Sequence, residues 1–141
     1  TYKTKLPSTI SADQYCILNL NTMEFLVSAT TDSEIEVASL SKVVTALLTI
    51  LVCRKYSIDM KSYRCRVSDE AAEMPGTSAE LEVGDVLTIE DLLYALMLPS
   101  GNDAATVLAE CIGKIIQRNK KKPSLLPPSK TFVRHMNILY K

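Results

Sequence analysis

Apolar residues recur at intervals of three and four positions between Leu40 and Leu51, which is the spacing of one face of an α-helix. The members of this row are Leu40, Val43, Val44, Leu47, Leu48 and Leu51. The opposite side of the same segment holds only small or apolar residues and two threonines, up to Cys53. The pattern predicts a buried helix whose apolar row faces the core and whose surface beyond the first turn is almost entirely covered.

Two short runs of β-forming residues precede this helix. Tyr15–Leu20 and Met23–Ala29 are separated by a polar pair that can turn, which predicts a β-hairpin over residues 15–29. Residues 1–14 are polar and are expected to form an irregular lead-in. The order of strand, strand, loop and helix predicts that the helix begins at the edge of a sheet.

The region 38–117 is predicted to be mainly helical. After the first helix it holds a short strand at 63–67, a helical turn at 68–74, an extended segment at 81–87 and two helices at 88–98 and 104–117. Thr88 and Asp91 form a capping pair at the start of one helix. Residues 118–130 are expected to form a basic, proline-rich loop, and residues 131–140 a final helix.

Length and charge limit the classes of protein that fit. The 141 residues are 47% hydrophobic, which suits one domain or a piece of one. Lys and Arg equal Asp and Glu at 16 each, so no net field draws the chain to nucleic acid. The basic run from Arg118 to Lys122 follows a predicted helix, where a solvated end that suits the helix dipole explains it.

The four cysteines show no metal-binding pattern. No two have C-x-x-C spacing, and the single His135 has no cysteine or second histidine close in sequence, so we expect no zinc site and no cofactor. Cys53 and Cys111 lie inside apolar helical patterns. Because buried thiols are common in such positions, the cysteines are predicted to be free thiols of the core.

No segment has the length of a membrane span. A span needs about 20 consecutive apolar residues, and the run from Val43 to Cys53 ends at Arg54. The N-terminus has charges but no apolar core of a signal peptide. The chain does not start with methionine, which suggests a processed or excised chain.

Ser39 and Lys42 stand out at the start of the apolar helix. Their spacing of three places both on one helix face, and desolvation disfavours the ammonium form of a lysine in such a place unless its charge is paired. A partly desolvated amine beside a hydroxyl can take its proton and make the serine a nucleophile. The plainer alternative is that serine begins the helix and lysine extends to solvent, because a short motif of this kind often occurs by chance.

Ser100-Gly101-Asn102-Asp103 forms a tight polar break between two apolar helices. This loop is expected to expose Ser100 and Asn102 at one end of the helical pair. The same residue types are also the usual ones of turns and helix caps, which by itself explains the loop.

Taken together and in this order, the two motifs resemble those of the penicillin-recognising serine enzymes, whose signatures are S-x-x-K, S-D-N and K-T-G. The segment Ala38-Ser39-Leu40-Ser41-Lys42 is similar to the A-S-L-T-K of D-alanyl-D-alanine carboxypeptidases, the low-molecular-weight penicillin-binding proteins. Residues 100–105 are similar to their S-G-N-D-A-A. Residues 84–93 resemble the G-E-x-x-T-x-x-D-L-L approach of the same family, and residues 132–137 its F-V-x-x-M-N helix.

The resemblance implies a role for each matching residue. Ser39 would be the nucleophile toward the penultimate D-alanine of a peptidoglycan stem peptide, and Lys42 the general base. Ser100 would relay a proton to the leaving amine, and Asn102 would bind the substrate amide. The implied partners are a D-Ala-D-Ala peptide or a β-lactam, with no metal and no nucleic acid, and the implied place is the cell envelope.

The resemblance also implies an α+β fold of the β-lactamase/transpeptidase-like type. The third signature is absent, because Lys130-Thr131 is followed by Phe132 where glycine is needed and is predicted to open a helix. We therefore expect a partial peptidase domain over residues 1–141, with an N-terminal hairpin and a helical cluster but without the C-terminal sheet strands.

Three functional hypotheses follow. The first is a serine D-Ala-D-Ala carboxypeptidase, motivated by Ser39, Lys42, Ser100 and Asn102. The second is a truncated, non-catalytic relative that serves as a binding or structural module, motivated by the missing third motif. The third is a β-lactamase, which would need a positioned glutamate in a later loop that this sequence does not reach.

Overall fold

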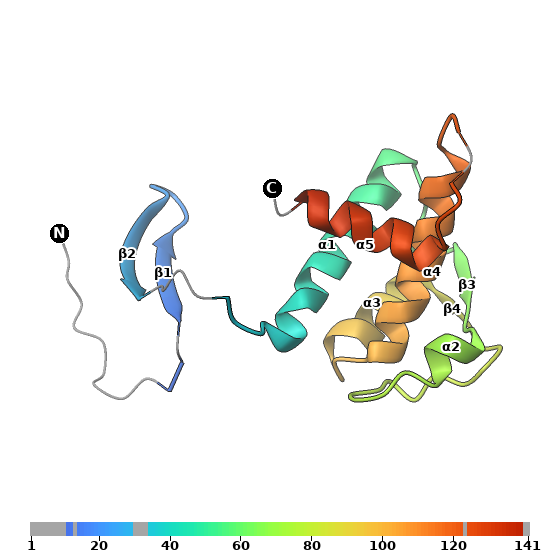
Figure 1. Cartoon of the computed structure of the whole chain (residues 1–141), viewed down its shortest axis with the longest axis horizontal. Coiled ribbons are helices and arrows are strands. Elements are labelled where there is room, and N and C mark those ends of the chain that lie inside the picture. Colours follow the sequence, from blue (N-terminus) through green and yellow to red (C-terminus); the bar gives the residue numbers. More distant parts are fainter. Residues whose placement is uncertain (1–10, 13, 30–33, 123, 140–141) are drawn as a thin grey trace. The chain divides into compact units, whose positions relative to one another are not determined.

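The structure is a computed structural model that describes residues 11–12, 14–29, 34–122 and 124–139 (Figure 1). The chain divides into two compact units, Thr1–Glu36 and Val37–Lys141. In the described residues, each unit contains one two-stranded antiparallel sheet. The described residues contain both strands and helices, as an α+β fold does.

The first unit is the predicted hairpin. Strand β1, Tyr15–Asn19, pairs with β2, Glu24–Ala29, and the register shifts once between Ile17 and Leu18. Asn19 closes the turn, because its carbonyl oxygen accepts a hydrogen bond from the Met23 amide at 2.7 Å. The predicted position of the helix start at a sheet edge concerns the relation between the two units and stays a prediction.

The second unit is a cluster of helices around α4. Its elements are the 3-10 turn η1, Ala38–Leu40, and then α1, Ser41–Lys55; β3, Arg64–Arg66; α2, Asp69–Ala72; β4, Val86–Thr88; α3, Ile89–Met97; α4, Asn102–Arg118; and α5, Pro128–Leu139. Helix α4 contacts α1, α2, α3, α5 and β3, and Figure 1 shows it running through the middle of this unit. Strands β3 and β4 are antiparallel.

Helix α3 begins where its capping residues predict. The Thr88 side chain accepts a hydrogen bond from the Asp91 amide, and the Asp91 carboxylate accepts one from the Thr88 amide. Ile89, Leu92 and Leu96 are fully buried at the three- and four-residue spacing of one helix face, whereas Met97 is 48% exposed. The cap therefore fixes the start of this helix.

The buried face of α1 differs from the prediction. Leu40, Val43, Leu47 and Leu51 are exposed, whereas Lys42, Thr45, Leu48, Thr49, Val52 and Cys53 are buried. Threonine can be buried here because its hydroxyl bonds back to the helix, as Thr49 Oγ1 does to the Thr45 carbonyl at 2.8 Å. Both sides of this helix were apolar enough to face a core, so the spacing alone did not identify the side that does.

The prediction that all the cysteines are free thiols was wrong. Cys65 and Cys111 form a disulfide that joins β3 to α4, with 6.1 Å between their Cα atoms. Spacing gave no sign of it because the two residues are 46 positions apart and each looks like an ordinary buried position of its own element. Cys16 and Cys53 are free, and burial raises the pKa of the Cys53 thiol to about 11.

Helix α5 begins at Pro128, three residues before the predicted start. Proline suits the first helical turn, where its missing amide proton costs no hydrogen bond. The helix packs closely on α4, since a β-carbon on Gly113 would collide with the backbone of Pro128. In the part of the chain that the structure describes, no helix is both long enough and apolar enough to span a bilayer.

Candidate active site

Ser39 lies in the 3-10 turn that leads into α1, and Lys42 lies in the first turn of α1 itself. Ser39 is exposed, whereas Lys42 is only 8% exposed. The Lys42 Nζ is 3.4 Å from the Ser39 Oγ. Ala38, just before the serine, has a φ of 44°, a left-handed conformation that costs free energy in a residue with a β-carbon. Such strain is typical of a backbone that presents a functional side chain.

The loop between α3 and α4 brings two more polar side chains to the same place. Ser100 Oγ donates a hydrogen bond to Ser39 Oγ at 2.8 Å. Lys42 Nζ donates one to Asn102 Oδ1 at 2.7 Å. Ser100 also has a left-handed backbone, with a φ of 60°. The four residues singled out in the sequence therefore meet in one cluster, although some sixty positions separate the two motifs.

A neighbouring loop holds Asn102 in place. Its side-chain Nδ2 donates to the Pro75 carbonyl at 2.7 Å, and its backbone amide donates to the Thr77 carbonyl at 2.7 Å. Thr77 Oγ1 in turn donates to the Ser100 carbonyl at 2.5 Å. Gly76 has a φ of +96°, and a β-carbon there would lie 2.7 Å from the Asn102 Nδ2. A glycine is thus needed where this loop passes over the asparagine.

Asp103 anchors the same loop farther along the chain. It was not identified as a site residue from the sequence. Its buried carboxylate accepts hydrogen bonds from Ser78 Oγ and from the amides of Ala79, Leu81 and Ala104. Burial raises the pKa of this carboxyl, but the hydrogen bonds outweigh burial and the pKa is lowered overall. An aspartate in a first helical turn is common, so only the folded contacts show what it does.

The arrangement contains the groups that an activated serine needs. The Ser39 hydroxyl lies between an amine and a second hydroxyl, and its backbone amide lies just before the N-terminus of α1. The distance of 3.4 Å from the lysine is long for a hydrogen bond, which is usual for such pairs without a substrate. The cluster has the composition of an acyl-transfer site.

Thr131, from the Lys130-Thr131 pair, has a structural position. It is buried in α5, and its Oγ1 accepts a hydrogen bond from Gln117 Nε2 at 2.7 Å. Lys130 beside it is exposed. This agrees with the prediction that the pair opens a helix and is not the strand motif of the family.

Comparison with known proteins gives consistent matches. A family model described as D-alanyl-D-alanine carboxypeptidase matches residues 1–116. The D-alanyl-D-alanine carboxypeptidase DacF of Bacillus subtilis is 32% identical over 96 residues, covering 68% of this chain and 24% of that relative. The D-alanyl-D-alanine carboxypeptidase of Streptomyces sp. strain K15 is 30% identical over 131 residues, covering 92% of this chain and 45% of the relative.

The crystal structure of the Streptomyces K15 DD-transpeptidase is also similar. It matches with a TM-score of 0.74 and 26% identity, covering 96% of this chain and 49% of that chain. The match agrees with the α+β, transpeptidase-like fold implied by the sequence motifs. The chain spans less than half the length of each of the two curated relatives.

Proposed function

Because the chain belongs to the D-alanyl-D-alanine carboxypeptidase family, we propose that it carries the nucleophile and general base of a serine acyl-transfer site for peptides that end in D-Ala-D-Ala. The observation that carries the proposal is the meeting of Ser39, Lys42, Ser100 and Asn102 within hydrogen-bonding distance. β-Lactams would react at the same serine, since they too present a carbonyl group to it.

In the proposed reaction, Ser39 Oγ attacks the carbonyl carbon of the penultimate D-alanine and its proton passes to the Lys42 amine. The peptide C–N bond then breaks. The terminal D-alanine leaves after its nitrogen takes a proton relayed through the Ser100 hydroxyl, and the rest of the peptide stays on Ser39 as an ester. A water molecule hydrolyses this ester and frees the serine.

Two further groups would orient and stabilise the substrate. Asn102 would bind the substrate amide, and its own position is fixed by hydrogen bonds to Pro75 and Thr77. The Ser39 backbone amide would donate to the developing oxyanion, where removing a single donor typically costs about 3 kcal/mol of transition-state stabilisation.

Acylation by a fluorescent penicillin tests the nucleophile. We expect labelling of the full chain, loss of labelling in Ser39→Ala, and retention in Ser41→Ala, which removes a hydroxyl two positions away on the same segment. Mass spectrometry would place the adduct on a peptide containing Ser39. Labelling that survives Ser39→Ala, or a chain that never labels, would contradict the proposal.

Turnover separates the three hypotheses. Release of D-alanine from a D-Ala-D-Ala peptide, lost in Lys42→Ala, is the expected result for a carboxypeptidase. A long-lived penicillin adduct without peptide turnover would indicate a binding relative, and rapid hydrolysis of penicillin would indicate a β-lactamase. General-base loss typically lowers the rate by about 10²- to 10⁴-fold.

A further inference from the structure

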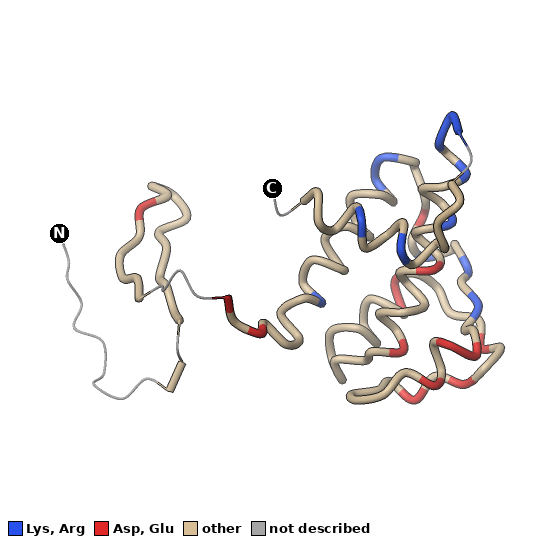
Figure 2. Tube along the Cα trace, in the orientation of Figure 1, with Lys and Arg blue, Asp and Glu red and all other residues tan. Residues whose placement is uncertain are grey.

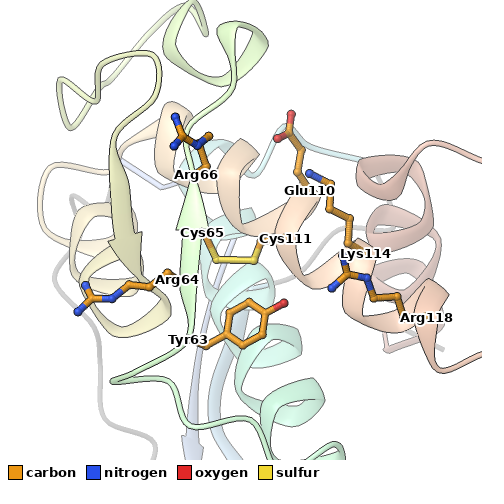
Figure 3. A pocket seen from close by; sticks show the side chains of 8 residues that line it. All are labelled: Tyr63, Arg64, Cys65, Arg66, Glu110, Cys111, Lys114 and Arg118. Atoms are coloured by element: carbon orange, nitrogen blue, oxygen red, sulfur yellow. A yellow bond between two sulfur atoms is a disulfide. The ribbon is translucent and has the colours of Figure 1, made fainter.

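A cavity of about 290 Å³ lies beside the Cys65–Cys111 disulfide, between β3 and the C-terminal half of α4 (Figure 3). Glu110, Lys114 and Arg118 line it from α4, Arg64 and Arg66 line it from β3, and Tyr63 lines it from the residue before β3. Lys114 is twelve residues beyond Asn102 on the same helix, which is about 18 Å along the axis at 1.5 Å per residue. The cavity is therefore separate from the candidate active site.

Two cations and one hydroxyl lie on the part of the wall formed by α4 and by the residue next to the disulfide. Figure 3 shows the Lys114 and Arg118 side chains on its α4 side, with the Tyr63 ring next to the disulfide and its hydroxyl pointing toward α4. Arg64 and Arg66 also line the cavity, but their guanidinium groups extend away from Lys114 and Arg118, because Cys65 between them points to α4 and successive strand residues face opposite sides. The charged and polar groups nearest the disulfide and α4 are thus one ammonium, one guanidinium, one phenol and the Glu110 carboxylate.

Neither Lys114 nor Arg118 has an acid partner in an ion pair among the residues that the structure describes. In the described parts of the chain the ion pair within 4.0 Å joins Lys61 to Glu90, so Lys114 and Arg118 form none there. The nearest acid in the wall is Glu110, one turn before Lys114, and its Oε1 accepts a hydrogen bond from Ser68 Oγ at 2.9 Å. A cation in the last turn suits the helix dipole, which explains Arg118 but not Lys114, a turn earlier.

The surroundings of the cavity are positive as well. Residues 114–134 contain seven Lys and Arg and no Asp or Glu, whereas residues 69–91 contain eight Asp and Glu and no Lys or Arg. Figure 2 shows the basic positions around the C-terminal end of α4 and the acidic positions around α2 and the loop after it. The net charge is zero, but basic and acidic residues are concentrated in different regions. The basic region attracts anions.

We propose that this cavity binds a phosphate group, either as inorganic phosphate or as part of a small phosphomonoester. Guanidinium offers paired donors that match phosphate oxygens, and the ammonium and phenol add a charge and a further donor. The charge of Lys114 and Arg118 together balances a phosphate dianion. The volume is close to the lower end of the roughly 300 to 1,000 Å³ of small-molecule sites, which leaves room for a small organic part.

Titration of the full chain, with its disulfide intact, tests this proposal. Inorganic phosphate, glycerol 3-phosphate and acetate are added in turn while amide chemical shifts are followed by NMR. We expect saturable shifts near Tyr63, Lys114 and Arg118 with the two phosphates and none with acetate. Tighter binding of glycerol 3-phosphate than of inorganic phosphate would identify a phosphomonoester, and the reverse order the free ion.

Three variants and one control sharpen the result. Lys114→Ala and Arg118→Ala should each weaken binding about tenfold or more, because each removes a charge-assisted contact. Glu110→Gln keeps the hydrogen bond to Ser68 but removes a repelling charge, so it should strengthen binding severalfold. Lys130→Ala removes the same charge from α5, outside the cavity, and should leave the affinity unchanged. Thermal unfolding of each variant checks that it is folded.

Several outcomes would overturn the proposal. They are an absence of saturable binding, binding that Lys114→Ala and Arg118→Ala leave intact, or equal binding of acetate. An effect of Lys130→Ala as large as that of Arg118→Ala would show general attraction by the basic side instead of a site. Weaker phosphate binding by Glu110→Gln would equally contradict the proposed geometry.

Discussion

Asp103 is a buried carboxylate that ties the 78–81 loop to the start of α4. Four groups donate hydrogen bonds to it, and three of them are backbone amides. The residue directly before Asp103 is Asn102, which contacts Lys42. A single carboxylate therefore supports the position of the whole second motif.

Asp103→Asn is expected to destabilise the chain at neutral pH by about 2 kcal/mol or more, because an amide replaces a buried, charged acceptor that receives hydrogen bonds from four groups. The lowered pKa of Asp103 means that its contribution is fully present above the ordinary value of 3.8 and is lost as the pH falls through the lower folded pKa. Urea unfolding at neutral and acidic pH measures this contribution. On acidification, the free energy of unfolding should fall less in the variant than in the parent chain.

Asp85→Asn is the control for that measurement. Asp85 is exposed and accepts one hydrogen bond, from the Glu82 amide at 3.0 Å. Its replacement should change the free energy of unfolding by less than about 1 kcal/mol. Equal losses in the two variants would show that Asp103 has no special structural role.

At the scale of single residues, the four side chains that meet were predicted from the sequence, but the residues that hold them in place were not. Ser39, Lys42, Ser100 and Asn102 were recognisable because two short motifs occur in a known order. Asp103 and Thr77 were not, because their partners lie more than twenty positions away and both residue types are ordinary in turns and helix starts. Contacts between distant loops leave no pattern in one sequence.

At the scale of elements, the pair α4 and α5 depends on one glycine. Gly113→Ala would normally favour a helix by about 1 kcal/mol. Here the added methyl group meets the Pro128 backbone, so we expect a net loss of about 1 to 3 kcal/mol in unfolding free energy. Urea unfolding measures this loss. The control is Lys114→Ala at the next position, which is exposed, and its free energy of unfolding should stay within about 0.5 kcal/mol of that of the parent. A stabilised Gly113→Ala would contradict this packing.

Leu47 and Leu48 form a matched pair that tests which side of α1 faces the core. Leu48 is 5% exposed and Leu47 is 49% exposed. Leu48→Ala should cost about 2 to 5 kcal/mol, as buried leucines do, whereas Leu47→Ala should cost less than about 1 kcal/mol. Chemical denaturation of both variants measures the two losses of unfolding free energy. Equal losses would support the buried face that the apolar spacing predicted.

The cysteines can be counted by alkylation and mass spectrometry. In the native chain we expect one label, on exposed Cys16, because Cys53 is buried with a raised pKa. Denaturation should add a label at Cys53, and only reduction should add labels at Cys65 and Cys111. Four labels without reductant would show that the thiols are free. Loss of this link should cost about 4 kcal/mol for a separation of 46 residues.

The sequence predicted elements with a local signal better than elements without one. Helix α3 carries its own capping pair, and the hairpin its own alternation and turn, so both were placed closely. The side of α1 that is buried depends on which face its neighbours cover, and the partner of Cys65 depends on where α4 passes. Both are properties of the folded chain and not of any window of residues.

At the scale of the molecule, the hydrophobic core lies in one of the two units. Every residue of the buried core cluster that the structure describes falls between Leu48 and Phe132. Because this cluster lies within the second unit, we expect that unit to fold without the hairpin, which alone would be marginally stable. A chain that begins at Val37 should keep the same urea midpoint and helical circular dichroism. Loss of cooperative unfolding in that chain would contradict this division.

Helix α4 carries two residues that each contact another part of the fold. Asn102 lies at the start of the helix and Cys111 lies farther along it. Inserting or deleting one residue between them would turn one end relative to the other by about 100°. The asparagine then could not reach Lys42 while the cysteine still reached Cys65. Natural length variation among relatives that keep both contacts should therefore fall after Arg118 and not within this helix.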